Sequence, residues 1–176
     1  MKSTLLSAII FTGISGLFFS CDKDEPPGTY FPPNQLMSLK ISNLESFWED
    51  EVIESVTPSV IECFDNYPGH LSSIRYVSEK YNMIAVSVFE SQLRALSAME
   101  ERRNDLPGIY QPGDSSETGR TWWYTTDELA CVYSAYVNVL NTIIEIHYYY
   151  DDLAAGKRLV LSTAEILSSR VEQMGR

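Results

Sequence analysis

The most regular apolar pattern in the chain lies in LACVYSAYVNVLNTIIEIHYYY, residues 129–150. Its large side chains recur at steps of four and three positions, at Leu129, Tyr133, Tyr136, Leu140, Ile143, His147 and Tyr150. This spacing is typical of one face of an α-helix, and its regularity favours near-parallel packing against neighbouring helices. We therefore expect this segment to form the central helix of a bundle.

Three other segments have a similar period. The first covers about residues 41–64 and is interrupted or kinked at Thr57-Pro58. The second runs from about Leu71 to Arg103, and the last begins after Asp151-Asp152. In the last segment, apolar residues repeat every seven positions, at Leu153, Val160, Leu167 and Met174. Each of these segments is predicted to be a helix.

The central helix has an alternative end, in which it continues to Ala155 and Gly156 terminates it. In either case we find no segment with strand periodicity, no solenoid-length repeat and no second domain. We therefore predict an all-α fold, a single-domain helical bundle over residues 34–176. Its simplest form has four helices, with a long loop between the second and the third.

The predicted loop covers residues 105–124 and contains two Pro-Gly pairs. A loop of this length inside a compact domain is usually functional or disordered. It ends directly before Thr125–Glu128, which matches a helix capping box. The loop carries four aromatic residues that are candidates for binding, Tyr110, Trp122, Trp123 and Tyr124. Exposed aromatic rings bind sugar rings or act as protein hot spots; alternatively, the rings of this loop pack inward at the end of the bundle.

The first residues of the chain have the organisation of an export signal. A charged start, Met1-Lys2, precedes an apolar run over residues 5–19 that is shorter than the ~20 residues of a membrane-spanning helix. Ser20-Cys21 then follows, and this junction resembles the lipobox of bacterial lipoproteins. Phe18 and Phe19 depart from the usual pattern, which has a leucine and a small residue there. The alternative is an ordinary secreted protein that is cleaved nearby.

The lipobox resemblance implies that residues 1–20 are a signal peptide and that Cys21 carries the lipid that attaches the protein to a membrane. Lys23-Asp24-Glu25 resembles the export tag of lipoproteins in some Gram-negative lineages, which implies an outer-membrane location, on the periplasmic face or the cell surface. Residues 21–33 contain four prolines. We predict that they form an extended tether, in which the twelve residues after Cys21 reach about 37 Å at ~3.1 Å per residue.

The chain is strongly acidic, with 13 Lys and Arg, 24 Asp and Glu, and a net charge of −11. Removal of residues 1–20 would take away one lysine and no acid. Such a surface repels nucleic acid, so we exclude nucleic-acid binding, and it favours a basic protein partner. The candidate docking patch for that partner is an acidic cluster, although such clusters are more often a solvated helix face. The cluster consists of Glu49, Asp50, Glu51 and Glu54.

Few residues suggest chemistry. His147 and Asp151 lie one turn apart on the predicted central helix and are a weak candidate for a metal or proton-sharing pair. The Glu-x-x-His pairs of dimetal bundles are absent, as are the common hydrolase, zinc and nucleotide-binding motifs. In an up-down bundle Cys63 and Cys131 lie beyond disulfide reach. Tyr148-Tyr149-Tyr150 must point in three directions on a helix, so at least one tyrosine is expected to be exposed.

These observations predict a lipid-anchored, non-enzymatic binding protein of the cell envelope, with no catalytic residue, cofactor or metal. Its expected partner is another protein, and neutralisation of a basic toxin or hydrolase by an inhibitor or immunity-type protein would fit the acidic charge. One alternative is a glycan or small-ligand binding lipoprotein that uses the aromatic loop. Another is an envelope hydrolase that uses carboxylates in no recognised motif.

Overall fold

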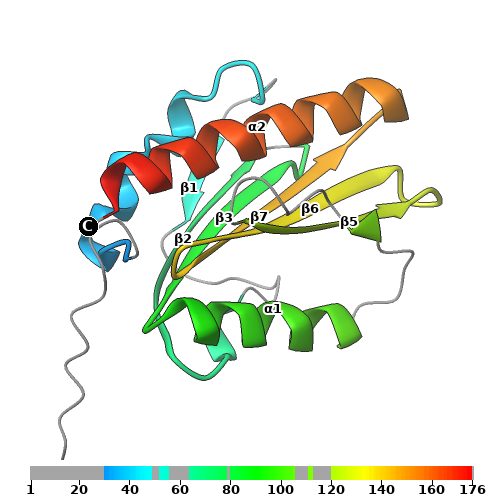
Figure 1. Cartoon of the computed structure of the whole chain (residues 1–176). Coiled ribbons are helices and arrows are strands. Elements are labelled where there is room, and N and C mark those ends of the chain that lie inside the picture. Colours follow the sequence, from blue (N-terminus) through cyan, green and yellow to red (C-terminus); the bar gives the residue numbers. More distant parts are fainter. Residues whose placement is uncertain are drawn as a thin grey trace, which may run out of the picture.

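The protein is a β-sheet with helices on both faces, and the predicted all-α helical bundle is therefore wrong (Figure 1). The computed structural model describes residues 30–48, 52–55, 64–78, 80–105, 111–112 and 120–175. Within these ranges no helix is long and apolar enough to cross a membrane.

The sheet has five long strands between two short edge strands. In chain order the strands are β1 (Val52–Ser55), β2 (His70–Ser78), β3 (Met83–Phe89), β4 (Gln111–Pro112), β5 (Thr121–Asp127), β6 (Val132–Val139) and β7 (Thr142–Tyr149). Their order across the sheet is β1-β2-β3-β7-β6-β5-β4, with every neighbouring pair antiparallel. The chain leaves the sheet after β3, reaches the opposite edge and returns as a meander, so β7 closes the centre against β3.

Two α-helices and three short 3₁₀ helices complete the fold. They are α1 (Gln92–Asp105), α2 (Leu153–Met174), η1 (Pro33–Leu39), η2 (Ile41–Asn43) and η3 (Phe64–Asn66). α1 lies on one face of the sheet and α2 lies on the other, next to the N-terminal segment (Figure 1). We call these the α1 face and the α2 face.

The predicted central helix is instead the β6–β7 hairpin. Its turn lies at Leu140 and Asn141, and Leu140 has a positive φ of 53°. Side chains alternate along β7: Ile144 and Ile146 belong to the core of the α2 face, and Ile143 belongs to the core of the α1 face. Because both faces are covered, apolar residues occupy nearly every position of these strands, and a helical period emerges by coincidence.

The second predicted helix, residues 71–103, is also wrong over its first half, which forms the β2–β3 hairpin; only its second half contributes to α1. The first predicted helix, residues 41–64, is also wrong in its described parts, which form η2, a turn at residues 45–47, β1 and the first residue of η3. The last predicted helix is confirmed, because α2 begins at Leu153 directly after Asp152. The alternative in which the central helix continues to Ala155 is wrong, since β7 ends at Tyr149.

One end of the sheet, which we call the Asn141 end, is closed by the start of the N-terminal segment at Phe31. The Asn141 side chain is fully buried; its Oδ1 accepts the Phe31 N–H at 2.6 Å, and its Nδ2 donates to the carbonyls of Phe31 and Phe89 at 3.2 and 2.7 Å. Phe31 is buried completely. The folded body therefore begins by Phe31, inside the range predicted to be tether.

Candidate functional site

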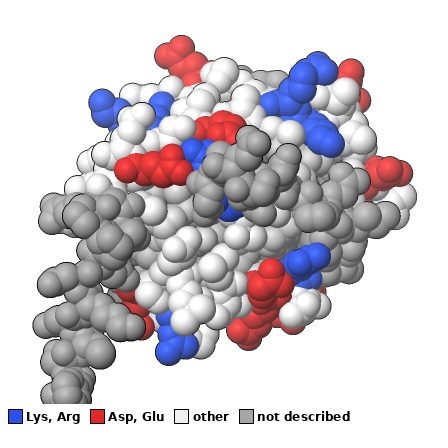
Figure 2. Space-filling view, viewed as in Figure 1, with Lys and Arg blue, Asp and Glu red and all other residues white. Residues whose placement is uncertain are grey.

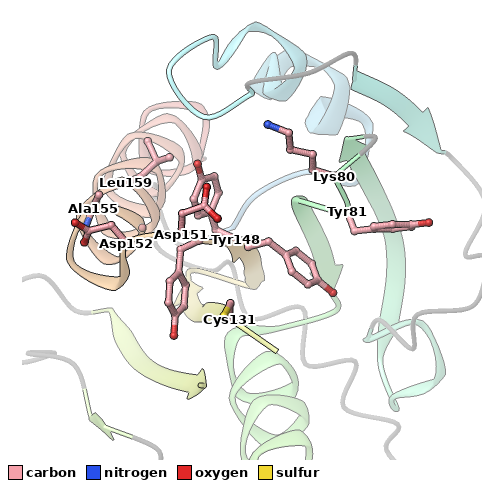
Figure 3. Close-up of a pocket in the computed structure, with 11 residues that line it drawn as sticks. Lys80, Tyr81, Cys131, Tyr148, Asp151, Asp152, Ala155 and Leu159 are labelled. Atoms are coloured by element: carbon pink, nitrogen blue, oxygen red, sulfur yellow. The ribbon is translucent and has the colours of Figure 1, made fainter. Parts of the chain in front are cut away.

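A cavity of about 730 Å³ opens at the other end of the sheet, which we call the pocket end (Figure 3). Three connections meet there: the β2–β3 turn, the β5–β6 turn and the junction of β7 with α2. Pockets that bind small ligands commonly have this size. The lining residues are Lys80, Tyr81, Cys131, Tyr148, Tyr149, Tyr150, Asp151, Asp152, Ala155, Gly156 and Leu159.

Hydrogen bonds fix the three connections relative to one another. The buried Asn82 of the β2–β3 turn accepts the Tyr149 N–H through its Oδ1 at 2.9 Å. The Cys131 carbonyl of the β5–β6 turn accepts the Tyr150 N–H, also at 2.9 Å. Tyr81 and Cys131 adopt positive φ values of 66° and 53°, which let both turns curve tightly. The pocket wall is therefore positioned by backbone contacts as well as by side-chain packing.

The first turns of α2 form one side of the pocket. Asp152 caps the helix, because its Oδ1 accepts the Ala155 N–H at 3.0 Å. Gly156 lies directly against Tyr150, and a Cβ at this glycine would stand only 2.8 Å from the Tyr150 Cβ. The absence of a side chain at Gly156 thus allows the helix to approach the tyrosine run closely.

Charged groups of both signs lie around this pocket, and exposed Lys157 and Arg158 follow its lining residue Gly156 on α2. Asp151 and Asp152 are exposed, and Lys80 is the one basic residue in the lining. Burial raises the pKa of Tyr150, and Cys131, Glu128 and Asp127 raise it further. This pKa direction means that the acids of the β5–β6 turn contribute to the negative potential at the pocket.

Exposed apolar side chains lie on the connections that form the pocket. Leu129 at the tip of the β5–β6 turn is 100% exposed and Tyr81 is 68% exposed, while Tyr149 and Leu153 are each more than a third exposed. These residues are half of the eight large hydrophobic side chains that are exposed in the described part of the chain. A concentration of such residues at one place indicates a surface that contacts another molecule.

The charged side chains that Figure 2 colours do not gather into one large patch. In Figure 2 the acidic and basic side chains that are coloured form small, separate groups among uncharged surface. The predicted acidic patch lies mostly outside the described residues, which exclude Glu49, Asp50 and Glu51. Glu54 is placed on β1 opposite Tyr76, but only its backbone is described.

The predicted aromatic platform does not form as an exposed surface. Trp122 and Trp123 are buried on opposite faces of β5, in the cores of the α2 and α1 faces respectively. Tyr124 is half-buried and stacks on Tyr133, with 6.0 Å between ring centroids. Tyr110 lies outside the described residues, as do Cys21 and Cys63. Cys131 is an exposed free thiol.

The predicted helix start at Thr125–Glu128 is wrong, because residues 121–127 form β5. Instead, Asp127 organises the β5–β6 turn, where its Oδ1 accepts the N–H groups of Leu129 and Ala130 at 3.0 Å each. An aspartate at the start of a turn commonly bonds to the backbone in this way. It thereby holds Leu129 at the exposed tip.

His147 and Asp151 are not one helical turn apart. His147 belongs to β7, whereas Asp151 follows the strand and lines the pocket. Among the described residues, no group of three or more His, Cys, Asp and Glu side chains is arranged to hold a metal ion.

His147 instead belongs to a polar chain on the α1 face. The Ser134 hydroxyl lies 2.6 Å from His147 Nδ1, and His147 Nε2 lies 2.7 Å from Glu145 Oε1. Glu145 is 1% exposed, and its Oε2 has no hydrogen-bond partner in the described structure. A serine–histidine–carboxylate chain can activate a nucleophile. Ser134, however, is buried in β6, whose backbone N–H groups pair with β5 and β7, so this strand has no free donor for an oxyanion.

Most pocket residues were not predicted as site residues from the sequence. They come from connections that are far apart in the chain, at residues 80–81, 131 and 148–159. The tyrosine run at 148–150 was a partial signal: the prediction that at least one of these residues is exposed is confirmed by Tyr149. Strand register was needed to find the rest.

No family model matches the chain, and no curated protein is significantly similar to it. The extracellular domain of PknH from Mycobacterium tuberculosis superposes on it with a TM-score of 0.55 at 10% identity, over 82% of this chain and 98% of that one. A GTP binding regulator from Thermotoga maritima reaches a TM-score of 0.46 at 10% identity, over 86% and 95% of the two chains. The first of these superpositions shows that this chain shares the fold of a β-rich extracellular domain.

Proposed function

We propose that this protein is a lipid-anchored, non-enzymatic binding protein of the cell envelope, which engages another protein through its pocket end. The observation that carries the proposal is the coincidence of a cavity, exposed apolar side chains and exposed charged groups, four acids among them, at one end of the sheet. Each of these features suits binding.

The apolar rim supports a protein partner. Tyr81 lines the cavity and Leu129 belongs to the β5–β6 turn whose Cys131 lines it; both side chains project into solvent, where a flat or convex protein surface can cover them. Exposed leucine and tyrosine side chains gain free energy when a partner removes them from water, at about 25 cal/mol per Å² of apolar surface. Tyrosine is also among the residues that dominate binding energy in protein interfaces.

The charges support a basic segment in that partner. Asp151, Asp152 and the two acids of the β5–β6 turn attract lysine and arginine side chains, and the tyrosine rings offer faces for a cation. An inhibitor or immunity-type protein that neutralises a basic toxin or hydrolase would use such a surface. The lipid at Cys21 and the location at the outer membrane of a Gram-negative bacterium rest on the lipobox and export-tag resemblances.

The size of the cavity favours a second candidate function, the binding of a glycan or another small ligand. A cavity of about 730 Å³ accommodates a ligand of several sugar units, and tyrosine rings stack on sugars. In this case the binding residues are the pocket tyrosines and not Trp122 and Trp123, whose rings are buried.

A titration with defined peptides tests the first candidate. The mature chain carrying Cys21→Ser, which prevents lipidation, would be labelled with ¹⁵N and titrated with a short peptide of alternating arginine and leucine. We expect amide shifts concentrated at residues 80–82, 127–131 and 148–156. A matched peptide with glutamate in place of arginine should cause none. Equal shifts with both peptides, or shifts at the Asn141 end, would refute the basic-partner proposal, and shifts with oligosaccharides alone would favour the second candidate.

A further inference from the structure

The start of the folded body, at Phe31, and the pocket lie at opposite ends of the sheet. Asn141, which binds both backbone groups of Phe31, stands directly before β7, and Tyr149 at the other end of β7 lines the pocket. β7 has eight residues, so at about 3.3 Å per residue the two ends are about 25 Å apart.

α2 spans the same distance on its own face of the sheet. Its first turns line the pocket, whereas Arg170 near its C-terminal end donates from Nη1 to the carbonyl of Leu39 at 2.6 Å. Figure 1 shows the N-terminal 3₁₀ segments beside the C-terminal end of this helix. Two independent sets of contacts therefore hold the start of the folded body far from the pocket.

The length of chain before the folded body limits how the domain can sit on a membrane. Eight residues, 22–29, separate Cys21 from Tyr30, and even fully extended they span about 30 Å. To bring the pocket to the bilayer, this segment would have to run back along the whole sheet and would be almost used up. No such stretch is needed when the Asn141 end faces the bilayer.

We infer that the pocket end faces away from the membrane to which Cys21 attaches. The inference rests on the proposed lipid anchor and deepens the proposed function, because it specifies the direction from which the partner arrives. The pocket is presented to a protein in the aqueous compartment, and a protein embedded beside it in the same bilayer meets the other end.

Fluorescent labels placed at the two ends of the sheet test this orientation. All labelled proteins are expressed from the full chain with Cys63→Ser. One carries the label on the native Cys131 at the pocket; the other carries Cys131→Ser and Met37→Cys, which places the label on an exposed residue of η1 at the opposite end. Each lipidated protein is inserted into vesicles of phosphatidylethanolamine and phosphatidylglycerol that contain a headgroup-linked quencher. Leu129→Cys in the Cys131→Ser chain provides a second label at the pocket end.

We expect at least about twofold stronger quenching at Met37→Cys than at Cys131 or Leu129→Cys, because about 25 Å of strand separates the two ends. Equal quenching, or stronger quenching at the pocket labels, would overturn the orientation. Absence of a lipid mass on Cys21 would overturn the anchor and the orientation together. Peptide binding by the soluble Cys21→Ser chain is measured separately, so loss of the binding function is distinguishable from either result.

Discussion

The Asn141 end and the pocket end satisfy their polar groups in different ways. At the Asn141 end, one buried amide side chain bonds to three backbone groups, and Phe31 is fully enclosed. At the pocket end, backbone bonds hold the turns together while the acids, tyrosines and Leu129 remain in contact with solvent. The first arrangement stabilises the fold, and the second leaves side chains available for a partner. Substitutions at the two ends should therefore separate stability from binding.

The largest loss of stability is expected for Asn141→Ala. The substitution leaves the Phe31 N–H and the carbonyls of Phe31 and Phe89 buried without this partner, at about 1–3 kcal/mol for each unsatisfied group. We expect the free energy of unfolding in urea to fall by about 3 kcal/mol or more. Asn104→Ala, at an exposed position of α1, is the matched control and should change it by less than about 0.5 kcal/mol. A loss below about 1 kcal/mol at Asn141 would mean that the clamp is not a main determinant of stability.

Gly156→Ala should affect both properties at the pocket end. Alanine normally stabilises a helix interior relative to glycine by up to about 1 kcal/mol. Here its Cβ would stand 2.8 Å from the Tyr150 Cβ, so α2 or the tyrosine run must shift. We expect a net destabilisation of about 1–2 kcal/mol in urea unfolding, together with altered tyrosine fluorescence. Ala154→Gly, at an exposed position in the first turn of α2, is the control for helix propensity. A stabilised Gly156→Ala protein would contradict the close approach.

The double substitution Asp151→Asn with Asp152→Asn should reduce affinity without a comparable loss of stability. Asparagine at 152 still caps α2, so the helix start is preserved. We expect the arginine–leucine peptide to bind about tenfold more weakly by calorimetry, with a smaller dependence on salt. Glu100→Gln with Glu101→Gln removes the same charge from exposed positions on α1 and should leave affinity nearly unchanged. Equal losses in both double variants would assign the effect to net charge.

Leu129→Ser is expected to have the smallest effect. The side chain is fully exposed, so the free energy of unfolding should stay within about 0.5 kcal/mol of the original value. Peptide affinity should fall about two- to threefold if Leu129 becomes covered on binding. Leu93→Ser, at another highly exposed leucine on α1, is the control for nonspecific apolar attraction. A loss of affinity at Leu93 equal to that at Leu129 would remove the β5–β6 turn from the binding surface.

Sequence patterns predicted the parts of the fold that are amphipathic on one side. α2 buries Val160, Leu167 and Val171 against the sheet and exposes its other side, so its helical period reflects its environment. The β6–β7 hairpin is covered on both faces, so apolar and polar residues do not alternate along it as they do in a strand with one exposed face. Its enrichment in valine, isoleucine and tyrosine was the available signal for strands. The spacing of three and four predicted a helix against this composition, and the predicted fold class was therefore wrong.

The binding site was less accessible to sequence reasoning than the fold. Aromatic residues at the end of a predicted loop suggested an exposed platform or inward packing; Trp122 and Trp123 pack inward, into two different cores, because β5 is covered on both faces. The pocket depends on contacts such as Asn82 with Tyr149, which are 67 positions apart. Pairings of this kind follow from strand order, which is not readable from local periodicity.

The contact between Phe31 and Asn141 also sets an order of events during folding. Its partners are 110 positions apart in the chain, so closing this loop carries a large entropic cost and must wait until β6 and β7 have formed their turn. In the proposed export the N-terminal segment would leave the cell interior first, yet it would lack its docking site until residue 141 had followed. For a chain modified at Cys21, that delay keeps the modification site accessible to a processing enzyme before the domain closes over Phe31.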